Sequence, residues 1–183
     1  MEREEALSLV KQEVKNKNLI KHMLAVEAVM RRLAAELGQD EELWALAGLL
    51  HDLDYDKTVD RPEQHGLLGA QILEEKGLPE ELVRAVKAHN PALGVARESL
   101  MDKALFAADP VTGLLVAAAL VHPQKKLAAI DLDFVLNRFK EKSFARGANR
   151  EQIESCSELD LSLEQFLALS LEAMQAAAAD LGL

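Results

Sequence analysis

The sequence is poor in cysteine and in aromatic residues. Cys156 is the only cysteine among 183 residues, so an internal disulfide and a thiolate metal cluster are both excluded. Aromatic residues make up 4% of the chain and β-branched residues seldom cluster, which together disfavour a β-sheet core. Alanine, leucine and glutamate dominate instead, and these residues favour helices. The composition therefore predicts an all-α fold.

The chain also lacks an excess of positive charge. Its formal net charge is -10 at pH 7, which argues against a nucleic acid polymer or an anionic membrane as a partner. We expect no apolar run to span a bilayer, and the residues after Met1 do not form a signal-peptide core. A cytoplasmic location is therefore expected. The acidic balance does not exclude a small phosphorylated molecule as a partner, and the oligomeric state is left open.

Apolar residues recur with helical spacing between clear turn signals. The spacing predicts helices over 3–15, 18–37, 41–53, 63–76, 79–89, 100–121, 132–140 and 163–181, with caps at Asn18, Asp40, Ser99, Asp131 and Ser162. Pro110 is expected to break or kink the helix over 100–121. The polar stretch 54–62 is predicted to be a loop. We expect a single domain over 1–183, with a motif-bearing core at about 18–122 and C-terminal helices at about 123–183 packed on it.

The histidines fall where the pattern predicts a buried helix face or a helix end. Four of the five do so, and they are His22, His51, His65 and His89. Each alone is readily explained as a hydrogen-bonded core residue. Together with the inward carboxylates Asp52 and Asp109 they need a common explanation, because burying such groups is costly without compensation. A metal ion provides one, since imidazole and carboxylate ligands together suit Fe, Mn, Co, Ni or Zn. His122 precedes a proline and is predicted to be a surface or structural residue.

The order and flanks of these residues resemble the signature of the HD-domain metal-dependent phosphohydrolases. The pattern comprises His22, Leu49-Leu50-His51-Asp52 and Phe106-Ala107-Ala108-Asp109. The resemblance implies an all-helical bundle in which His22, His51, Asp52 and Asp109 bind one divalent ion. His65 and His89 match the two extra histidines of the binuclear branch, in which Asp52 would bridge two ions. Fe or Mn is the metal expected first, with Zn, Co, Ni or Mg as alternatives.

Residues beside the ligand set are candidates for other roles. Asp52, Asp54 and Lys57 are the catalytic candidates, with Lys57 as a contact to substrate phosphate, as in some relatives. Asp54, Asp56 and Asp102 are candidates to orient ligand imidazoles, although a salt bridge to a neighbouring helix explains Asp102 equally well. A basic stretch in the C-terminal part is expected to be mostly a solvated face, with one or two residues near the site as phosphate clamps. It comprises Lys125, Lys126, Arg138, Lys142, Arg146 and Arg150.

The resemblance implies hydrolysis of a phosphate ester of a small metabolite, foremost a nucleotide, by a metal-bound water. The sequence lacks the Gly-Tyr-Pro tripeptide of the cyclic-dinucleotide phosphodiesterase branch, which argues against that substrate. Two alternatives stay open. A diiron oxygenase branch of the same superfamily uses the same six-ligand pattern. A non-catalytic signalling module of the HD type ranks third, because such modules typically lose ligands and this chain keeps all six.

Overall fold

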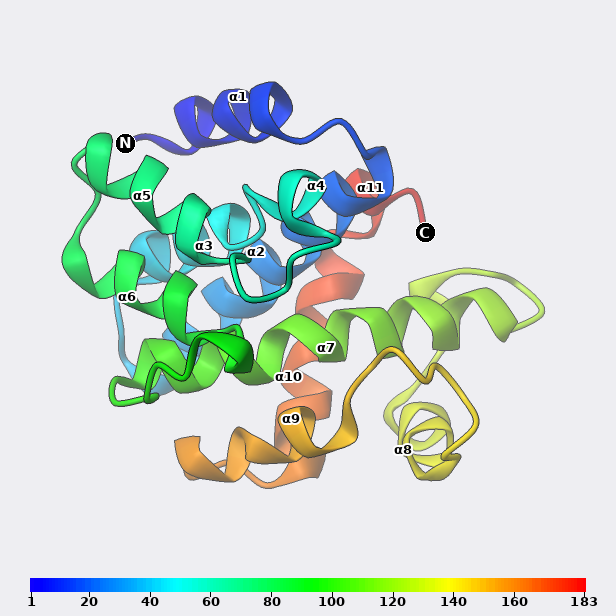
Figure 1. The fold of residues 1–183 in the computed structure, drawn as a ribbon. Coiled ribbons are helices and arrows are strands. Elements are labelled where there is room, and N and C mark those ends of the chain that lie inside the picture. Colours follow the sequence, from blue (N-terminus) through cyan, green and yellow to red (C-terminus); the bar gives the residue numbers. More distant parts are fainter.

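All regular structure in the protein is helical. The computed structural model describes residues 1–183 and contains no strand, which confirms the all-α prediction (Figure 1). The α-helices are α1 (Arg3–Glu13), α2 (Lys17–Leu37), α3 (Glu41–Leu50), α4 (Tyr55–Thr58), α5 (Leu67–Glu75), α6 (Glu80–Ala88), α7 (Leu100–Val121), α8 (Leu132–Lys140), α9 (Arg150–Glu154), α10 (Leu163–Ala176) and α11 (Ala178–Leu181). Short 3₁₀ turns lie at Pro91–Leu93, Leu127–Ala129 and Ser155–Leu159.

The two longest helices, α2 and α7, organise one continuous core. Buried apolar residues from α1 to α11 form a single cluster, in which Met23, Trp44 and Phe166 are among the largest fully buried side chains. α7 runs through the middle of the molecule, with α10 crossing behind it (Figure 1). α3 to α6 lie on one side of α7, whereas α8 and α9 lie on the other (Figure 1). This arrangement leaves α2, α6 and α7 around the C-terminal end of α3.

Most helix starts follow the predicted capping residues. The side chains of Asp40, Ser99, Asp131 and Ser162 accept backbone N–H bonds at the first turns of α3, α7, α8 and α10. The prediction for α2 was wrong by two residues, because Asn16 is the cap and its side chain accepts from the backbone N–H groups of residues 18 and 19. The predicted helix over 163–181 is divided at residue 177 into α10 and α11.

Pro110 does not interrupt α7. The helix continues from Leu100 to Val121, and Pro110 is buried within it. A proline removes one backbone hydrogen bond, and burial of the long apolar face compensates for that loss. We expected no apolar run to span a bilayer. Judged only by length and composition, however, the unbroken helix α7 is long and apolar enough to cross a membrane. However, 61% of its most apolar window is buried inside the protein, as in the core helix of a globular domain.

The segment between α3 and α5 differs from the prediction in a way that matters for the site. The predicted loop over 54–62 contains the single-turn helix α4. The helix expected over 63–76 begins only at Leu67, after Gly66 in a left-handed conformation with φ 82°. His65 therefore lies in the turn that precedes α5, not on the apolar face of a helix. Gly66 is required here because a Cβ would lie 2.8 Å from the carbonyl oxygen of Val86.

Candidate metal centre

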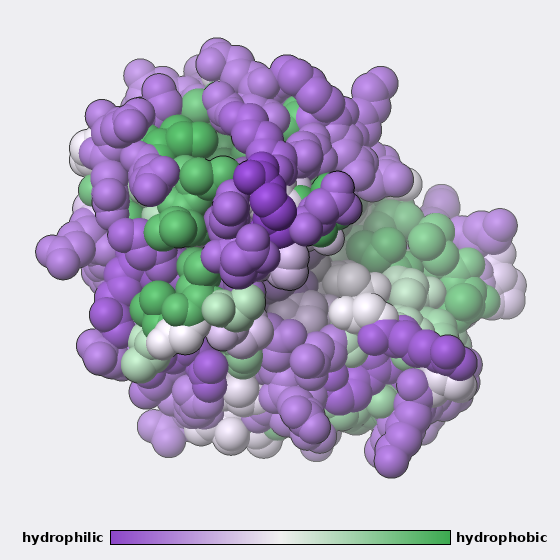
Figure 2. Space-filling view, in the orientation of Figure 1, coloured by the Kyte–Doolittle hydropathy of each residue, from purple (hydrophilic) through white to green (hydrophobic).

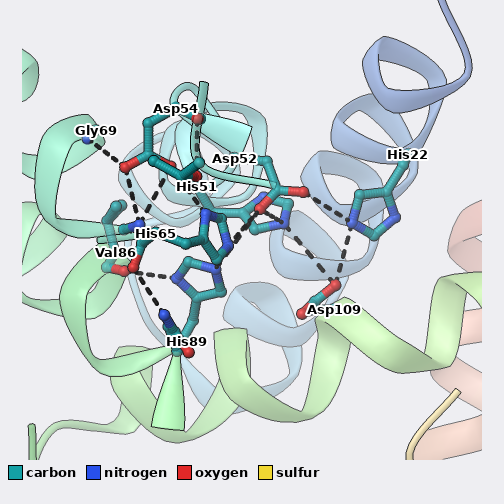
Figure 3. Close-up of polar contacts among 12 residues, drawn as sticks. His22, His51, Asp52, Asp54, His65, Gly69, Val86, His89 and Asp109 are labelled. Carbon is teal, nitrogen blue, oxygen red and sulfur yellow. Dashed lines mark hydrogen bonds and ion pairs between the residues drawn. The ribbon is translucent and has the colours of Figure 1, made fainter. Parts of the chain in front are cut away.

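The six predicted ligand residues converge on one buried point (Figure 3). They come from α2, the end of α3, the turn before α5, the end of α6 and the middle of α7. In chain order these are His22, His51, Asp52, His65, His89 and Asp109. The grouping is that of histidine and aspartate residues in HD metal sites.

The position of His51 depends on a close approach between α3 and α2. A Cβ on Gly48 would lie 2.7 Å from the carbonyl oxygen of Val26, so only glycine allows the two helix backbones to touch here. The carbonyl oxygen of Gly48 then accepts a hydrogen bond from Nδ1 of His51 at 2.8 Å. His51 is fully buried. The same glycine thus sets both the helix spacing and the orientation of the imidazole.

Each of the four histidines at the centre uses its Nδ1 to bind an acceptor outside the centre. The Nδ1 atoms of His51 and His89 donate to the backbone carbonyls of Gly48 and Val86. Thr112 donates its hydroxyl proton to the carbonyl of Asp109, so it accepts from Nδ1 of His22 at 3.0 Å. For His65 the acceptor is Oδ1 of Asp54 at 2.8 Å. Because Nδ1 carries the proton in each neutral ring, the Nε2 lone pair of each points into the centre.

Asp52 lies between the four Nε2 atoms. Its Oδ1 is 3.3 Å from Nε2 of His51, 3.2 Å from Nε2 of His65 and 3.6 Å from Nε2 of His89. Its Oδ2 is 3.6 Å from Nε2 of His22. The two oxygens of one carboxylate therefore face different histidines. Oδ1 of Asp109 completes the side next to His22, at 3.1 Å from its Nε2.

The donor set fits a cation. Nε2 of His51 is buried and has no hydrogen-bond partner, although two carboxylates are close to it. Nε2 of His65 and Nε2 of His89 are only 3.0 Å apart, so a proton or a cation is needed between these two nitrogen atoms. Two overlapping triads can each offer three ligand atoms within 4.8 Å of one another; they are His22, His51 and Asp109, and His51, Asp52 and His89. These buried acceptors suggest divalent metal binding.

The ionisation of the centre points to the same conclusion. Burial lowers the pKa of His51 to about 4, so this imidazole is neutral at pH 7. Burial also opposes ionisation of Asp52, but the neighbouring histidines outweigh it and hold the pKa of Asp52 well below its usual range. Burial lowers the pKa of His65, but hydrogen bonds to Asp52 and Asp54 outweigh this effect and raise the pKa to about 10. In the metal-free protein a proton on His65 therefore provides positive charge between the carboxylates.

Asp54 contacts the Nδ1 side of His65, outside the centre. Its side chain is fully buried and accepts from Nδ1 of His65 and from the backbone N–H groups of Gly66 and Gly69. Burial opposes its ionisation, but these hydrogen bonds lower its pKa. Both oxygens are used in this way, so Asp54 is placed to position His65 and not to face the cavity.

Other predicted site residues are not at the centre. Lys57 forms an ion pair with Glu13 of α1 and does not line the cavity at the centre. The carboxylate of Asp56 accepts from the backbone N–H groups of residues 15 and 16 and ties α4 to the chain before α2. Asp102 pairs with Nε of Arg84 at 3.1 Å and caps α7, so the salt-bridge alternative is the one observed.

Two of the C-terminal basic residues, Arg138 and Arg150, and His122 have structural partners. The guanidinium of Arg150 donates to five backbone carbonyls between residues 138 and 148, which closes the turn between α8 and α9. Arg138 pairs with Glu141. His122 caps α7 and packs edge-on against Phe134, in agreement with its predicted structural role. None of these residues lines the cavity at the centre.

The sequence analysis missed two residues at the centre. Thr112 orients His22, and its signal in the sequence was its place one helical turn after Asp109. Tyr55, the only tyrosine, packs edge-on against His65 at 5.2 Å between ring centroids. Both follow a ligand residue at short spacing. The centre opens to solvent through a cavity of about 340 Å³ lined by Asn16, Leu19, His22, Asp52, Tyr55, His65 and Asp109.

Comparisons with known proteins agree with this arrangement. The family model described as HD domain matches residues 19–114. Ribonuclease Y of Desulfotalea psychrophila is 32% identical over 139 residues, which cover 73% of this chain and 26% of that protein. An uncharacterized protein of Methanocaldococcus jannaschii is 30% identical over 150 residues, covering 78% of this chain and 86% of that protein. A tRNA (cytidine(56)-2'-O)-methyltransferase of Picrophilus torridus is 27% identical over 150 residues, covering 80% and 43%.

The extent of these matches differs. The chain spans about a quarter of the length of the ribonuclease Y proteins, and most of the length of the archaeal protein. No solved structure is matched by the chain. The matched region, residues 19–114, contains all six clustered histidine and aspartate residues. The chain therefore belongs to the HD domain family.

Proposed function

We propose that the protein is a metal-dependent phosphohydrolase that hydrolyses a phosphate ester of a small metabolite. Membership of the HD domain family supports the general class of metal-dependent hydrolase. The observation that carries the proposal is the convergence of four Nε2 lone pairs and two carboxylates at the floor of an open cavity. Such a donor set recruits divalent ions, and divalent ions are suited to phosphate chemistry.

In this proposal each of the six residues is a metal ligand. His22, His51 and Asp109 hold one ion, and His65 and His89 hold a second. Asp52 would serve both sets of ligands, a role supported by the separate orientations of its oxygens towards His22 and His65. Fe or Mn is the metal proposed first, because both accept mixed imidazole and carboxylate ligands. Bound ions would supply Lewis acidity and activate water at neutral pH.

The chain itself orients the ligands and shapes the cavity. The Nδ1 acceptors fix the imidazoles, and Asp54 acts as a positioning residue for His65. Tyr55 and Asn16 form part of the cavity wall and limit access to Asp52. No lysine or arginine lines this cavity. Lys57 is therefore not included among the proposed phosphate contacts.

RNA is a second candidate substrate, because several relatives are named ribonuclease Y. The name describes those proteins, of which this chain matches about a quarter. The net charge of -10 and the lack of basic residues in the cavity favour a small ester over a polyanionic polymer. A nucleotide substrate and a cytoplasmic location stay predictions from the sequence.

The proposal is tested by a substrate screen with defined metals. Protein loaded with Mn, Fe, Co or Mg is incubated with nucleotides, alkyl phosphates, a generic phosphodiester and an oligoribonucleotide, with and without oxygen. The expected result is anaerobic release of phosphate or an alcohol from small esters, lost in Asp52→Asn. Turnover that requires both iron and oxygen would support the diiron oxygenase alternative. Absence of turnover in every well-folded, metal-loaded sample would support the signalling module.

A further inference from the structure

A second cavity adjoins the metal centre. It has a volume of about 570 Å³ and lies between α2, the C-terminal half of α7 and the segment 181–183. His22 lines both cavities, and Thr112, which orients His22, lines the second. The imidazole of His22 therefore borders both cavities. A volume of this size is typical of pockets that bind small molecules.

The walls of this second cavity, which we call the α7 groove, are mostly aliphatic. α7 contributes Gly113, Val116, Ala117 and Leu120, and α2 contributes Ala25. Figure 2 shows a hollow in this region, with hydrophobic residues over the C-terminal half of α7 beside it. Leu120 is 49% exposed, so this part of the groove is open to solvent. Apolar surface next to a polar centre is suited to an amphipathic ligand.

Polar groups in the α7 groove are few and lie towards α2. Asn18 and Lys21 are the polar side chains there apart from His22 and Thr112. A nucleobase in the groove would leave most of its hydrogen-bonding edge against aliphatic side chains, which is unfavourable. An alkyl or aryl group would gain from the same surface without unpaired polar atoms.

We propose that the α7 groove binds the apolar organic group of the substrate while its phosphate lies at the metal centre. This inference rests on the proposed function and narrows it to phosphate esters of apolar alcohols. The shared residue His22 places the phosphate end of such a ligand next to the groove entrance. The charged end then meets the histidine and aspartate cluster, and the apolar end follows α7 towards Leu120.

Alkylphosphonates test the proposal by binding, since their phosphorus–carbon bond is not hydrolysed as an ester. Calorimetry compares methyl-, butyl- and octylphosphonate on the Mn-loaded and the metal-free full chain. The affinity of the Mn-loaded protein is expected to rise about two- to fourfold with each added methylene until the groove is filled. Gly113→Phe and Ala117→Phe, one helical turn apart in the groove, should each remove most of this dependence. Gln71→Phe on the exposed surface of α5 is the matched control and should keep it.

The outcomes separate this inference from the proposed function. Equal affinity for methyl- and octylphosphonate would overturn the groove assignment, whereas metal-dependent methylphosphonate binding would leave the phosphate site standing. Octylphosphonate binding that is unaffected by metal removal would uphold the groove and contradict phosphate recognition at the centre. A dimer in sedimentation experiments that Ala117→Phe dissociates, together with no chain-length dependence, would show that a second copy covers the groove and would overturn the proposal.

Discussion

Replacing Gly48 with alanine should damage the metal centre through helix packing. The new Cβ would lie 2.7 Å from the carbonyl oxygen of Val26 and 2.8 Å from the backbone nitrogen of Glu27. Neither atom is a flexible side-chain end, so α3 must move away from α2. His51 follows Gly48 by three residues and is hydrogen-bonded to its carbonyl, so the imidazole moves with the helix.

The size of the effect can be worked out from two opposing contributions. Overpacking of a tight contact costs about 1–3 kcal/mol. The higher helix propensity of alanine stabilises the folded state by about 1 kcal/mol at a helix interior. We therefore expect Gly48→Ala to lower the free energy of unfolding by up to about 2 kcal/mol. Metal affinity should fall as well, because a shift of about 0.5 Å is enough to disturb a ligand constellation.

Gly113→Ala is the matched control. Gly113 also lies in a helix, but a Cβ there has no heavy atom within 4 Å, so only the propensity gain remains. This variant should be more stable than the wild type by about 0.5–1 kcal/mol. Urea denaturation with excess chelator measures the packing effect alone, and metal analysis of reconstituted protein measures the effect on the centre. If Gly48→Ala proves as stable as Gly113→Ala and retains as much metal, the helix contact does not position His51.

Four further predictions depend on the ionisation and burial of single groups. Asp54→Asn should weaken metal binding about 10- to 100-fold, measured by chelator competition, because His65 loses its charged acceptor. Metal binding at pH 7 should release about one to two protons, measured in weakly buffered solution, because the pKa of His65 is raised to about 10 and that of His22 is also raised. For the same reason the contribution of His65 to metal-free stability is complete below about pH 6.5 and is lost as the pH rises through about 10. Cys156, whose pKa burial raises to about 11, should react with a thiol reagent at pH 8 only after unfolding; rapid reaction of the native protein would contradict its buried position.

The sequence predicts the local features of the fold well. Helix caps such as Ser99 depend on residues three positions apart, and the inward positions of His22 and Asp109 depend on helical spacing. Such signals are contained within one segment, so they are visible without a structure. The predicted all-α fold and the set of six clustered residues rest on this kind of signal and on the family resemblance.

Features that depend on contacts between segments were missed. His65 was expected on a helix face, yet hydrogen bonds from the turn to Asp54 hold the chain in a non-helical conformation and delay the start of α5. Pro110 was expected to interrupt α7, yet the buried surroundings of the helix stabilise it across the proline. Lys57 was a candidate for phosphate binding, but its partner Glu13 is 44 residues away in sequence. No local pattern reports such pairings.

The central claim is that His22, His51, Asp52, His65, His89 and Asp109 form one centre for divalent metal ions. The most direct measurement is the metal content of protein reconstituted anaerobically with Fe or Mn and then desalted. We expect about two ions per wild-type chain and less than one in Asp52→Asn, because this change removes the carboxylate between the two sets of ligands. Asp56→Asn, which alters an exposed carboxylate four residues away, should retain the wild-type content. Wild-type metal content in folded Asp52→Asn would contradict the account.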